Sequence, residues 1–565
     1  MGKGAAADAA PSFKKGVRMK YNLYSSGNTQ LHLTAIRKSE TPGAVRIWNR
    51  DRLWTEFYFK YDSYETCFLP LEQNTDYIIE LDRIHISLAY WYDPENVLEQ
   101  GVTFLEFGDE IHFYSKDTMA DAMNQPYRNQ IHFSPYKNWM NDPNGLCWFQ
   151  GYYHVFYQYN PNSQVWGNMH WGHAVSKDLI HWKHLPVAIY PQIELAGCTG
   201  YRGGAFSGCA VIENDQMQLF YTRHFGRTDR SWQRQWQVTR HSRDGVTFSH
   251  EEICIWGTPE GVLYDFRDPK VTRIQEQWVM VLGGSCHGRP SVFQYISSDL
   301  KNWNYRGILY QEQNPIYGIA ECPDFFPLDG MYVLITGYIY ADKTNQESRD
   351  TRYYIGTYED NQFHPVSEGL FDYGKDIYAA QTFEKDGRRI CFGWNCPPAE
   401  GHIETPDGSN GTLSLPRELN IRENRLVSLP CHEIQDLFTE MVQPGPYYLK
   451  LTRDLSSPES EVLLAKGDGS KLGLRVTDSN IEICLLCPEK SSDTISFTCR
   501  FSTVRPIETI DIYMDRAMLE LYVNEGELSC SRRFYMKNPI LQPEIIRSSC
   551  RTMNLKRIRS IWERP

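Results

Sequence analysis

No long hydrophobic run occurs in this sequence of 565 residues. A helix that crosses a membrane needs about 20 consecutive apolar residues. No segment approaches that length, so we expect no membrane partner. Residues 1–17 are rich in Ala, Gly and Lys and lack the apolar core of a secretory signal. A cytoplasmic protein with reduced thiols is therefore the simplest expectation.

Basic residues are outnumbered by acidic ones, and metal-binding cysteine patterns are scarce. The formal net charge is −12 at pH 7, which disfavours a nucleic acid as partner because the phosphate backbone would be repelled. The 15 cysteines are scattered through the chain, and their spacing indicates no zinc site. We therefore expect no bound metal.

Aromatic residues, by contrast, are abundant. They make up 14% of the chain, with 36 Tyr and 15 Trp. Such rings suit carbohydrate sites, because the C–H faces of sugars pack against them, and they also suit the core of a β-rich fold. Composition alone leaves both interpretations open and favours the core.

The length of the chain predicts two to four domains. We expect residues 1–18 to be disordered. Residues 19–116 contain short strand patterns, for example 31–36, 55–61, 77–81 and 111–114, and these indicate a β-sandwich-like accessory module. The polar stretch 117–126, which ends in a proline, is expected to be a linker.

The middle of the chain, residues 127–428, repeats itself. A turn followed by an apolar strand recurs five times, and a strand, an acidic turn and an aromatic residue recur behind the first four copies. Units of roughly 50 to 70 residues with about four strands are typical of propeller blades. We therefore predict an all-β chain with a five-bladed β-propeller. Alternating strand patterns predict a β-sandwich in residues 429–565.

Three of the predicted blades carry an acid in the segment that opens them. Asp142 lies in Asn-Asp-Pro-Asn-Gly, Asp268 in Phe-Arg-Asp-Pro, and Glu321 in Glu-Cys-Pro-Asp. The innermost strands of a propeller begin around one end of its central channel, so equivalent positions in different blades converge there. We therefore expect the three carboxylates to share one funnel.

Glycosidic cleavage requires such a group of acids. Its transition state is oxocarbenium-like, so a carboxylate must face the anomeric carbon while an acid protonates the leaving oxygen. Taken singly, the motifs have ordinary explanations: a turn around Asp142, a surface ion pair of Arg267 with Asp268, a solvated Glu321 and a packing role for Cys322. Their joint occurrence in phase with the repeat favours a catalytic site.

These motifs resemble the signature of glycoside hydrolase family 32, which contains invertases, levanases and exo-inulinases. The resemblance covers roughly residues 127 to 540. It rests on the segments 132–135, 139–145, 156–161, 166–173, 206–208, 266–271, 321–324 and 413–419, and on Asp515-Arg516 with Glu520, Asn524 and Gly526.

The resemblance implies a β-fructofuranosidase that acts by double displacement with net retention and needs no metal or organic cofactor. Asp142 would be the nucleophile that forms a covalent fructosyl-enzyme, Glu321 the general acid/base, and Asp268 the transition-state stabiliser. The fructose pocket would be formed by Asn141, Gln158, Trp166, Phe206, Ser207, Arg267, Tyr378 and Trp394.

Three segments depart from the family pattern. The minimal family architecture has no N-terminal module, and the segments 196–204 and 221–226 differ from the usual loop and strand end. The last two segments flank the funnel, so the choice of substrate remains open. The candidates are sucrose, a fructo-oligosaccharide, a fructan and a phosphorylated sucrose. Transfer of fructose to a sugar acceptor is an alternative to hydrolysis. A catalytically silent carbohydrate-binding propeller is another alternative, although the intact acid triad argues against it.

Overall fold

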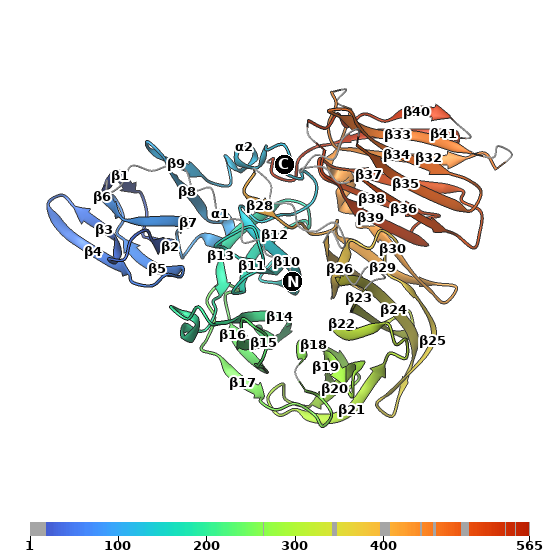
Figure 1. Ribbon diagram of the computed structural model, residues 1–565, viewed down its shortest axis with the longest axis horizontal. Helices are drawn as coiled ribbons and strands as arrows, with labels where there is room; N and C mark the ends of the chain where they lie inside the picture. Colours follow the sequence, from blue (N-terminus) through green and yellow to red (C-terminus); the bar gives the residue numbers. More distant parts are fainter. Residues whose placement is uncertain are drawn as a thin grey trace. The chain divides into compact units, whose positions relative to one another are not determined.

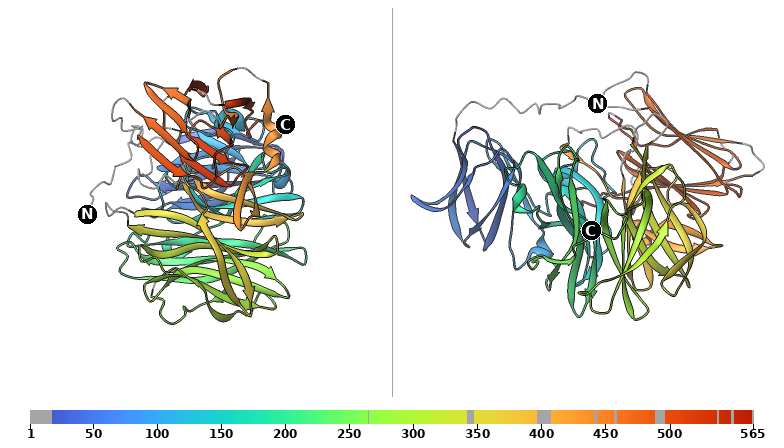
Figure 2. Two further views of the ribbon diagram at one scale, coloured as in Figure 1. Left: turned by 90° about the vertical axis from the view of Figure 1, so that its right-hand side faces the viewer. Right: turned by 60° about the horizontal axis from the view of Figure 1, so that its bottom comes forward.

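The computed structural model describes residues 18–263, 265–341, 347–395, 407–440, 443–455, 459–487, 496–536, 538–547 and 550–563. These residues form β-strands and connecting turns almost throughout, which confirms the predicted all-β class (Figure 1 and Figure 2). The start that was predicted to be disordered lies, apart from Arg18, outside the described residues. In the described ranges, no helix is long and apolar enough to cross a membrane.

The chain divides into two compact units. Met1–Asn96 and Thr103–Phe113 form the first unit, and Val97–Val102 and Tyr114–Pro565 form the second. The second unit contains the short helix α1 (Val97–Gln100) and α2 (Met119–Met123), which lies in the stretch predicted to be a linker. It also contains two 3-10 helices, Ile193–Leu195 and His432–Leu437.

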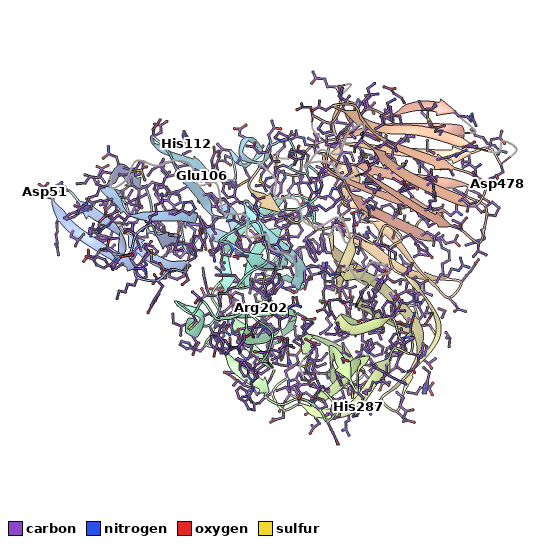
Figure 3. All side chains as sticks on the ribbon, viewed as in Figure 1. Asp51, Glu106, His112, Arg202, His287 and Asp478 are labelled. Carbon is purple, nitrogen blue, oxygen red and sulfur yellow. The ribbon has the colours of Figure 1, made fainter. Side chains whose placement is uncertain are left out.

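The first unit is built from two sheets around one apolar core. One sheet has the order β1-β6-β3-β4 and the other β5-β2-β7-β8-β9. Leu33, Ile47 and Ile79 are fully buried in the core, and they come from both sheets. Asp51, labelled in Figure 3, lies in the tight turn between β3 and β4. The strands are β1 (Met19–Ser25), β2 (Thr29–Arg37), β3 (Gly43–Asn49), β4 (Arg52–Phe59), β5 (Glu65–Leu71), β6 (Thr75–Asp82), β7 (Ile84–Tyr92), β8 (Thr103–Phe107) and β9 (Ile111–Tyr114).

Five successive sheets, each built around four antiparallel strands, form the middle of the second unit. Their first strands are β10, β14, β18, β22 and β26; each contacts the next, and β26 contacts β10, so the five strands close a ring (Figure 1).

The five sheets follow one another in chain order. The first sheet has β10 (Asn138–Phe149), β11 (Tyr152–Asn160), β12 (His170–Ser176), β13 (Trp182–Ile189) and β28 (Ser409–Asn410). The second has β14 (Tyr201–Glu213), β15 (Gln216–Arg227), β16 (Gln233–Ser242) and β17 (Glu252–Ile255). The third has β18 (Phe266–Ile274), β19 (Gln277–Cys286), β20 (Arg289–Ser297) and β21 (Asn304–Gln311). The fourth has β22 (Tyr317–Leu328), β23 (Met331–Ala341), β24 (Glu347–Glu359) and β25 (Gln362–Leu370). The fifth has β26 (Ile377–Lys385), β27 (Arg388–Asn395), β29 (Arg417–Arg422) and β30 (Arg425–Pro430).

The acidic turn that recurs in the sequence has one hydrogen-bonding pattern in three of these sheets. A serine Oγ donates to the carboxylate of the aspartate two residues later, at 2.9 Å in all three copies. The same carboxylate accepts the backbone N–H groups two and three residues further on. This local pairing explains why aspartate recurs there. The pairs are Ser176–Asp178, Ser242–Asp244 and Ser297–Asp299.

Two further sheets form the C-terminal part of the second unit. Their orders are β31-β41-β32-β37-β38-β39 and β36-β35-β34-β33-β40. Leu449, Leu472 and Ile512 are fully buried in a core to which both sheets contribute, as expected for a sandwich. The strands are β31 (Phe438–Thr439), β32 (Tyr447–Arg453), β33 (Ser460–Gly467), β34 (Ser470–Val476), β35 (Asn480–Leu486), β36 (Phe497–Ser502), β37 (Thr509–Met514), β38 (Met518–Val523), β39 (Leu528–Arg533), β40 (Glu544–Arg547) and β41 (Cys550–Ile558).

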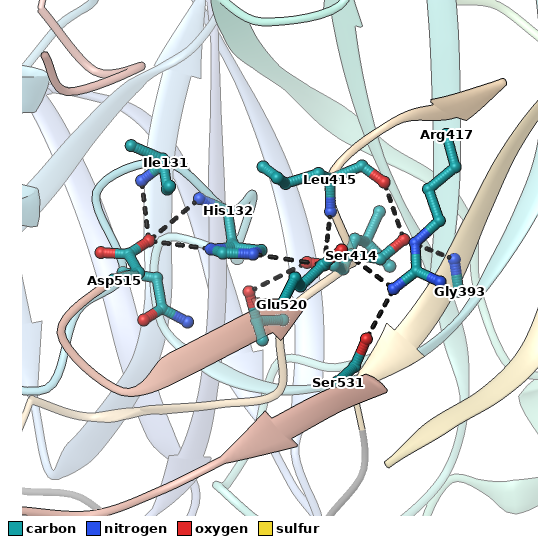
Figure 4. Close-up of polar contacts among 12 residues, drawn as sticks. Ile131, His132, Gly393, Ser414, Leu415, Arg417, Asp515, Glu520 and Ser531 are labelled. Atoms are coloured by element: carbon teal, nitrogen blue, oxygen red, sulfur yellow. Dashed lines mark hydrogen bonds and ion pairs between the residues drawn. The ribbon is translucent and has the colours of Figure 1, made fainter. Parts of the chain in front are cut away.

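A buried ionic network, defined by His132, Arg417, Asp515 and Glu520, joins the ring to these C-terminal sheets (Figure 4). His132 Nδ1 lies 2.9 Å from Asp515 Oδ2, and its Nε2 lies 3.3 Å from Glu520 Oε1. Arg417 donates to Glu520 Oε2 at 2.9 Å. Burial alone would lower the pKa of His132, but its bonds to the two carboxylates raise that pKa to about 9.

Candidate active site

Each first strand of the ring carries a β-bulge, in which two residues of that strand lie opposite one residue of its neighbour. A bulge changes the direction in which nearby side chains point, and bulges are frequent beside active sites. Asp268 and Cys322, inside two of the bulges, have φ values of 63° and 47°, which are left-handed conformations that cost energy for non-glycine residues. The bulges fall between Met140 and Pro143, Ala205 and Gly208, Arg267 and Lys270, Glu321 and Asp324, and Tyr378 and Gln381.

One cavity of about 560 Å³ is lined by residues from all five bulged strands. It brings together every site residue that the sequence predicts. These are Asp142, Asp268 and Glu321 with Asn141, Gln158, Trp166, Phe206, Ser207, Arg267, Tyr378 and Trp394. The lining also includes residues that the sequence did not single out: Trp139, Arg202, His224, Arg230, Gln233, Gln235, Asp265, Ile319, Ile339 and Arg349.

Asp142, on β10, is oriented by a residue of the next sheet. Ser207 Oγ, on β14, donates to Asp142 Oδ2 at 2.6 Å. Burial and the neighbouring Glu321 raise the pKa of Asp142, although hydrogen bonds from Ser207 and Asn141 oppose that rise. The Oδ1 of Asn141 in turn accepts a hydrogen bond from Trp139 Nε1 at 2.7 Å. The aspartate therefore has a fixed direction within a crowded site.

Asp268, on β18, is 4% exposed and lies among like charges. Burial raises its pKa most; Arg267 opposes the rise, whereas Glu321 and Asp142 add to it, and the resulting pKa is about 7. Its Oδ2 accepts the backbone N–H of Cys322 at 3.0 Å. A carboxyl that titrates near neutrality is typical of functional sites.

Glu321, on β22, has a hydrogen bond to each carboxylate oxygen. Arg267 Nη2 donates to Oε1 at 2.6 Å, and the hydroxyl of Tyr378 donates to Oε2 at 2.7 Å. Arg267 also binds Asp265. The side chain of Glu321 is thus positioned from two sides, by the third and the fifth sheets.

Cys322 packs in a buried cluster, as its residue type suggests, but it also contacts two acids. Its Sγ lies 3.5 Å from Asp268 Oδ2 and 3.6 Å from Asp142 Oδ2. Burial, followed by the three neighbouring carboxylates, raises the pKa of this thiol well above its usual range. The thiol is therefore a neutral hydrogen-bond donor between Asp142 and Asp268.

Two arginines lie on the side of the cavity formed by the second sheet. The guanidinium of Arg202, labelled in Figure 3, lies over the ring of Trp166 at 5.3 Å. Burial and the nearby Arg230 lower the pKa of Arg202. Neither arginine has a carboxylate partner within the described part of the chain. Arg202 and His224 belong to the two segments that depart from the family pattern, which is the one signal that pointed to them.

No group of three His, Cys, Asp or Glu side chains is arranged to hold a metal ion in the described ranges of the chain. The cavity instead combines three carboxylates with hydrogen-bond donors and aromatic walls. Phe206 stacks on His224 with ring centres 4.3 Å apart, and Trp139 meets Trp394 edge-on at 5.7 Å. Such a cavity suits a hydroxyl-rich ligand whose reaction develops positive charge.

Comparison with known proteins supports this chemistry. The family model described as "Glycosyl hydrolases family 32 N-terminal domain" matches residues 132–430. A sucrose-6-phosphate hydrolase of Zymomonas mobilis is 39% identical over 435 residues, which are 70% of this chain and 84% of the relative. A levanase of Bacillus subtilis is 28% identical over 464 residues, 71% of this chain and 65% of the levanase.

Solved structures show the same relationship. A family 32 glycoside hydrolase from Bifidobacterium adolescentis has a TM-score of 0.85 at 26% identity, and the match covers 96% of this chain and 100% of that one. A β-fructofuranosidase of Bombyx mori, solved as a mutant with sucrose, has a TM-score of 0.67 at 28% identity over 78% of this chain and 97% of its own. This chain is a glycosidase and belongs to glycoside hydrolase family 32.

Proposed function

We propose that the protein releases fructose from sucrose or β-fructans by double displacement with net retention. The observation that carries this proposal is the meeting of Asp142, Asp268 and Glu321, from three different sheets, at one cavity. The names of the relatives, sucrose-6-phosphate hydrolase and levanase, support a fructoside as the substrate. A silent carbohydrate-binding protein would not need three crowded carboxylates, whose mutual repulsion costs stability.

We propose that the five sheets of the ring are the blades of a five-bladed β-propeller. The supports are the closed ring of first strands and the bulge that all five share. The proposed propeller spans residues 127–428 and is followed by the sandwich of residues 429–565. Residues 19–116 are proposed as an accessory module, connected through 117–126.

In this mechanism Asp142 attacks the anomeric carbon of fructose and forms a covalent fructosyl-enzyme. Its hydrogen bond from Ser207 fixes the carboxylate for attack. Glu321 donates a proton to the departing oxygen and, in the second step, takes one from water. The bonds from Arg267 and Tyr378 orient Glu321 for both steps.

Asp268 is proposed to accept hydrogen bonds from fructose hydroxyls and to stabilise the positive charge of the transition state. A buried carboxylate does this more strongly than an exposed one, because little water screens it. Because its pKa is raised to about 7, the fraction of Asp268 that is ionised, and able to act, increases as the pH rises through neutrality.

Identification of the first-formed sugar tests the mechanism. Proton NMR during sucrose hydrolysis should show β-fructofuranose before mutarotation, because two displacements restore the starting configuration. Initial release of the α-anomer would exclude the double displacement. Fructo-oligosaccharides in place of free fructose would identify a transferase, in which a sugar acceptor replaces water in the second step.

A phosphorylated sucrose is a second candidate substrate, which Arg202 and Arg230 favour. Two arginines without carboxylate partners beside a substrate cavity, among the described residues, suit an anionic group, and guanidinium groups bind phosphate bidentately. We expect a kcat/KM at least tenfold higher on sucrose 6-phosphate than on sucrose, and Arg202→Gln should abolish most of that preference. Arg227→Gln is the matched control, since Arg227 pairs with Asp229 and does not line the cavity. Equal kcat/KM values on the two sugars would exclude this candidate.

A further inference from the structure

The second sheet of the ring has two different faces where it reaches the cavity. In the β14–β15 pairing, Gly204 lies opposite His224, whereas Gly203 lies opposite Phe225. Paired residues share a face of a sheet, and the faces alternate along each strand. Arg202 and His224 both line the cavity. They share one face of the sheet, because Arg202 lies two residues from Gly204, the partner of His224. Phe225 therefore lies on the opposite face.

Three aromatic side chains, Tyr201, Phe225 and Trp232, form an array that we call the rim strip. The rings of Tyr201 and Phe225 stack with their centres 5.0 Å apart and their planes only 2° apart. Trp232 meets Phe225 edge-on at 6.1 Å and is 44% exposed. An exposed indole supported by two half-buried rings is rigid, so a ligand that stacks on it loses little conformational entropy of the protein.

The rim strip adjoins the cavity along the chain, although none of its three residues lines the cavity itself. Trp232 lies in the turn between β15 and β16, and its neighbours Arg230 and Gln233 both line the cavity. A hydrogen bond of 2.8 Å from the N–H of Arg227 to the carbonyl of Trp232 closes this turn. A chain molecule whose end lies among the carboxylates can therefore leave the cavity past Trp232.

We propose that the rim strip binds the distal units of a β-fructan chain whose terminal fructose occupies the cavity. This inference rests on the proposed function and adds a polymer subsite to it. Sugar rings present C–H faces that pack on aromatic rings, and a fructan is uncharged. The strip suits an uncharged ligand, because its three residues carry no charge and the adjacent Arg227 is paired with Asp229. Arg234, which lies opposite Phe225 on this face, has its guanidinium over the ring of Trp256 at 3.8 Å.

Substitution of Trp232 in the full-length chain tests the proposal. Trp232→Ala should lower kcat/KM on levan or inulin about tenfold, the value of one well-placed aromatic contact, and change that on sucrose less than twofold. The matched control is Tyr305→Ala on β21, because Tyr305 has the same 44% exposure and does not line the cavity. We expect wild-type kcat/KM values from this control on all three substrates.

Binding is measured separately, in native gels that contain levan or inulin. Proteins with Asp142→Asn are used there so that the polymer is not digested. At least one polymer should retard this protein, and adding Trp232→Ala should remove most of the retardation. Equal losses on polymer and sucrose, unchanged retardation, or a change of oligomeric state in place of a polymer effect would each overturn the proposal. Failure of the wild type to release fructose from sucrose, levan and inulin alike would instead overturn the proposed function, and the gels would still test the rim strip.

Discussion

Two groups of buried charge in the second unit differ in how completely their charges are paired. In the ionic network, cations and carboxylates alternate. Burial alone would raise the pKa of Glu520, but Arg417 and His132 lower it to about 2. In the cavity Arg267 is the only cation that lies within ion-pair distance of any of the three carboxylates among the described residues, and it also binds Asp265. There, burial and like charge raise the pKa of Asp268 to about 7.

The difference fits a structural role for the ionic network and the catalytic role proposed for the cavity carboxylates. Paired charges favour their own ionised forms and stabilise the arrangement that pairs them, whereas crowded carboxylates oppose their own ionisation. The crowding of these carboxylates would be relieved if positive charge developed on a bound sugar. We therefore expect substitutions in the cavity to change the rate of reaction, and substitutions in the ionic network to change stability.

The largest expected effect is that of Asp142→Asn on turnover. The amide is a poor nucleophile, so kcat on sucrose or fructan should fall by about 10⁴-fold or more. Since the side chain keeps its shape and can still accept the bond from Ser207, Tm should change little. Steady-state kinetics and a thermal melt check both parts. A wild-type kcat would remove Asp142 from the mechanism. A large fall in Tm would show that Asp142 has a structural role like that of the ionic network.

Glu520→Gln should have the opposite profile. It leaves Arg417 and His132 buried without a full counter-charge, which should cost about 3–5 kcal/mol of unfolding free energy. The control is Glu525→Gln, because Glu525 forms an exposed ion pair with Arg422 and its loss should cost less than about 0.5 kcal/mol. Urea unfolding at pH 7 measures both values. Similar losses for the two variants would show that the ionic network contributes no more than a surface pair.

The sequence predicted the cavity better than it predicted the ionic network, for a physical reason. Asp142, Asp268 and Glu321 lie in short local motifs that recur in phase with the repeat, so their convergence follows from the repeat alone. The pairing of His132 with Asp515 joins residues 383 positions apart, and no local pattern encodes it. Asp515 was noticed only through a family resemblance.

The bulges and Arg202 show a second limit of sequence reasoning. A bulge shifts the two-residue alternation of a strand by one position, and no residue type marks it, so the directions of the side chains around Asp268 and Cys322 could not be predicted. Arg202 was missed because a single arginine in a glycine-rich segment has no pattern. The all-β class was predicted correctly because strand and turn patterns are local.

The pH dependence of stability gives a smaller effect that sharpens the comparison. The pKa of His132 is about 9 in the folded protein, above the usual value of about 6.5 in an unfolded chain. Its contribution to stability is therefore fully present below pH 6.5 and is lost as the pH rises through 9, on the order of 3 kcal/mol in total. Between pH 6 and pH 9.5 the unfolding free energy of the wild type should therefore fall by about 3 kcal/mol more than that of His132→Gln. An equal pH dependence in both proteins would show that His132 is not charged in the folded state.

The smallest expected effect, and the one that tests the comparison most directly, is a gain of stability in Asp268→Asn. The folded pKa of Asp268 is about 7, whereas an unfolded aspartate titrates near 3.8, so this group opposes folding increasingly as the pH rises from about 4 to 7. Asparagine removes that cost and can still accept the N–H of Cys322. The pKa shift alone corresponds to about 4 kcal/mol at pH 8, but the amide loses the charge contact with Arg267, so we expect an inactive variant that is about 1–2 kcal/mol more stable at pH 8, with a smaller gain at pH 5. Urea unfolding at the two pH values checks the sign. A loss of stability at pH 8 would mean that the cavity carboxylates are as well paired as Glu520, and the distinction between the two charge groups would fail.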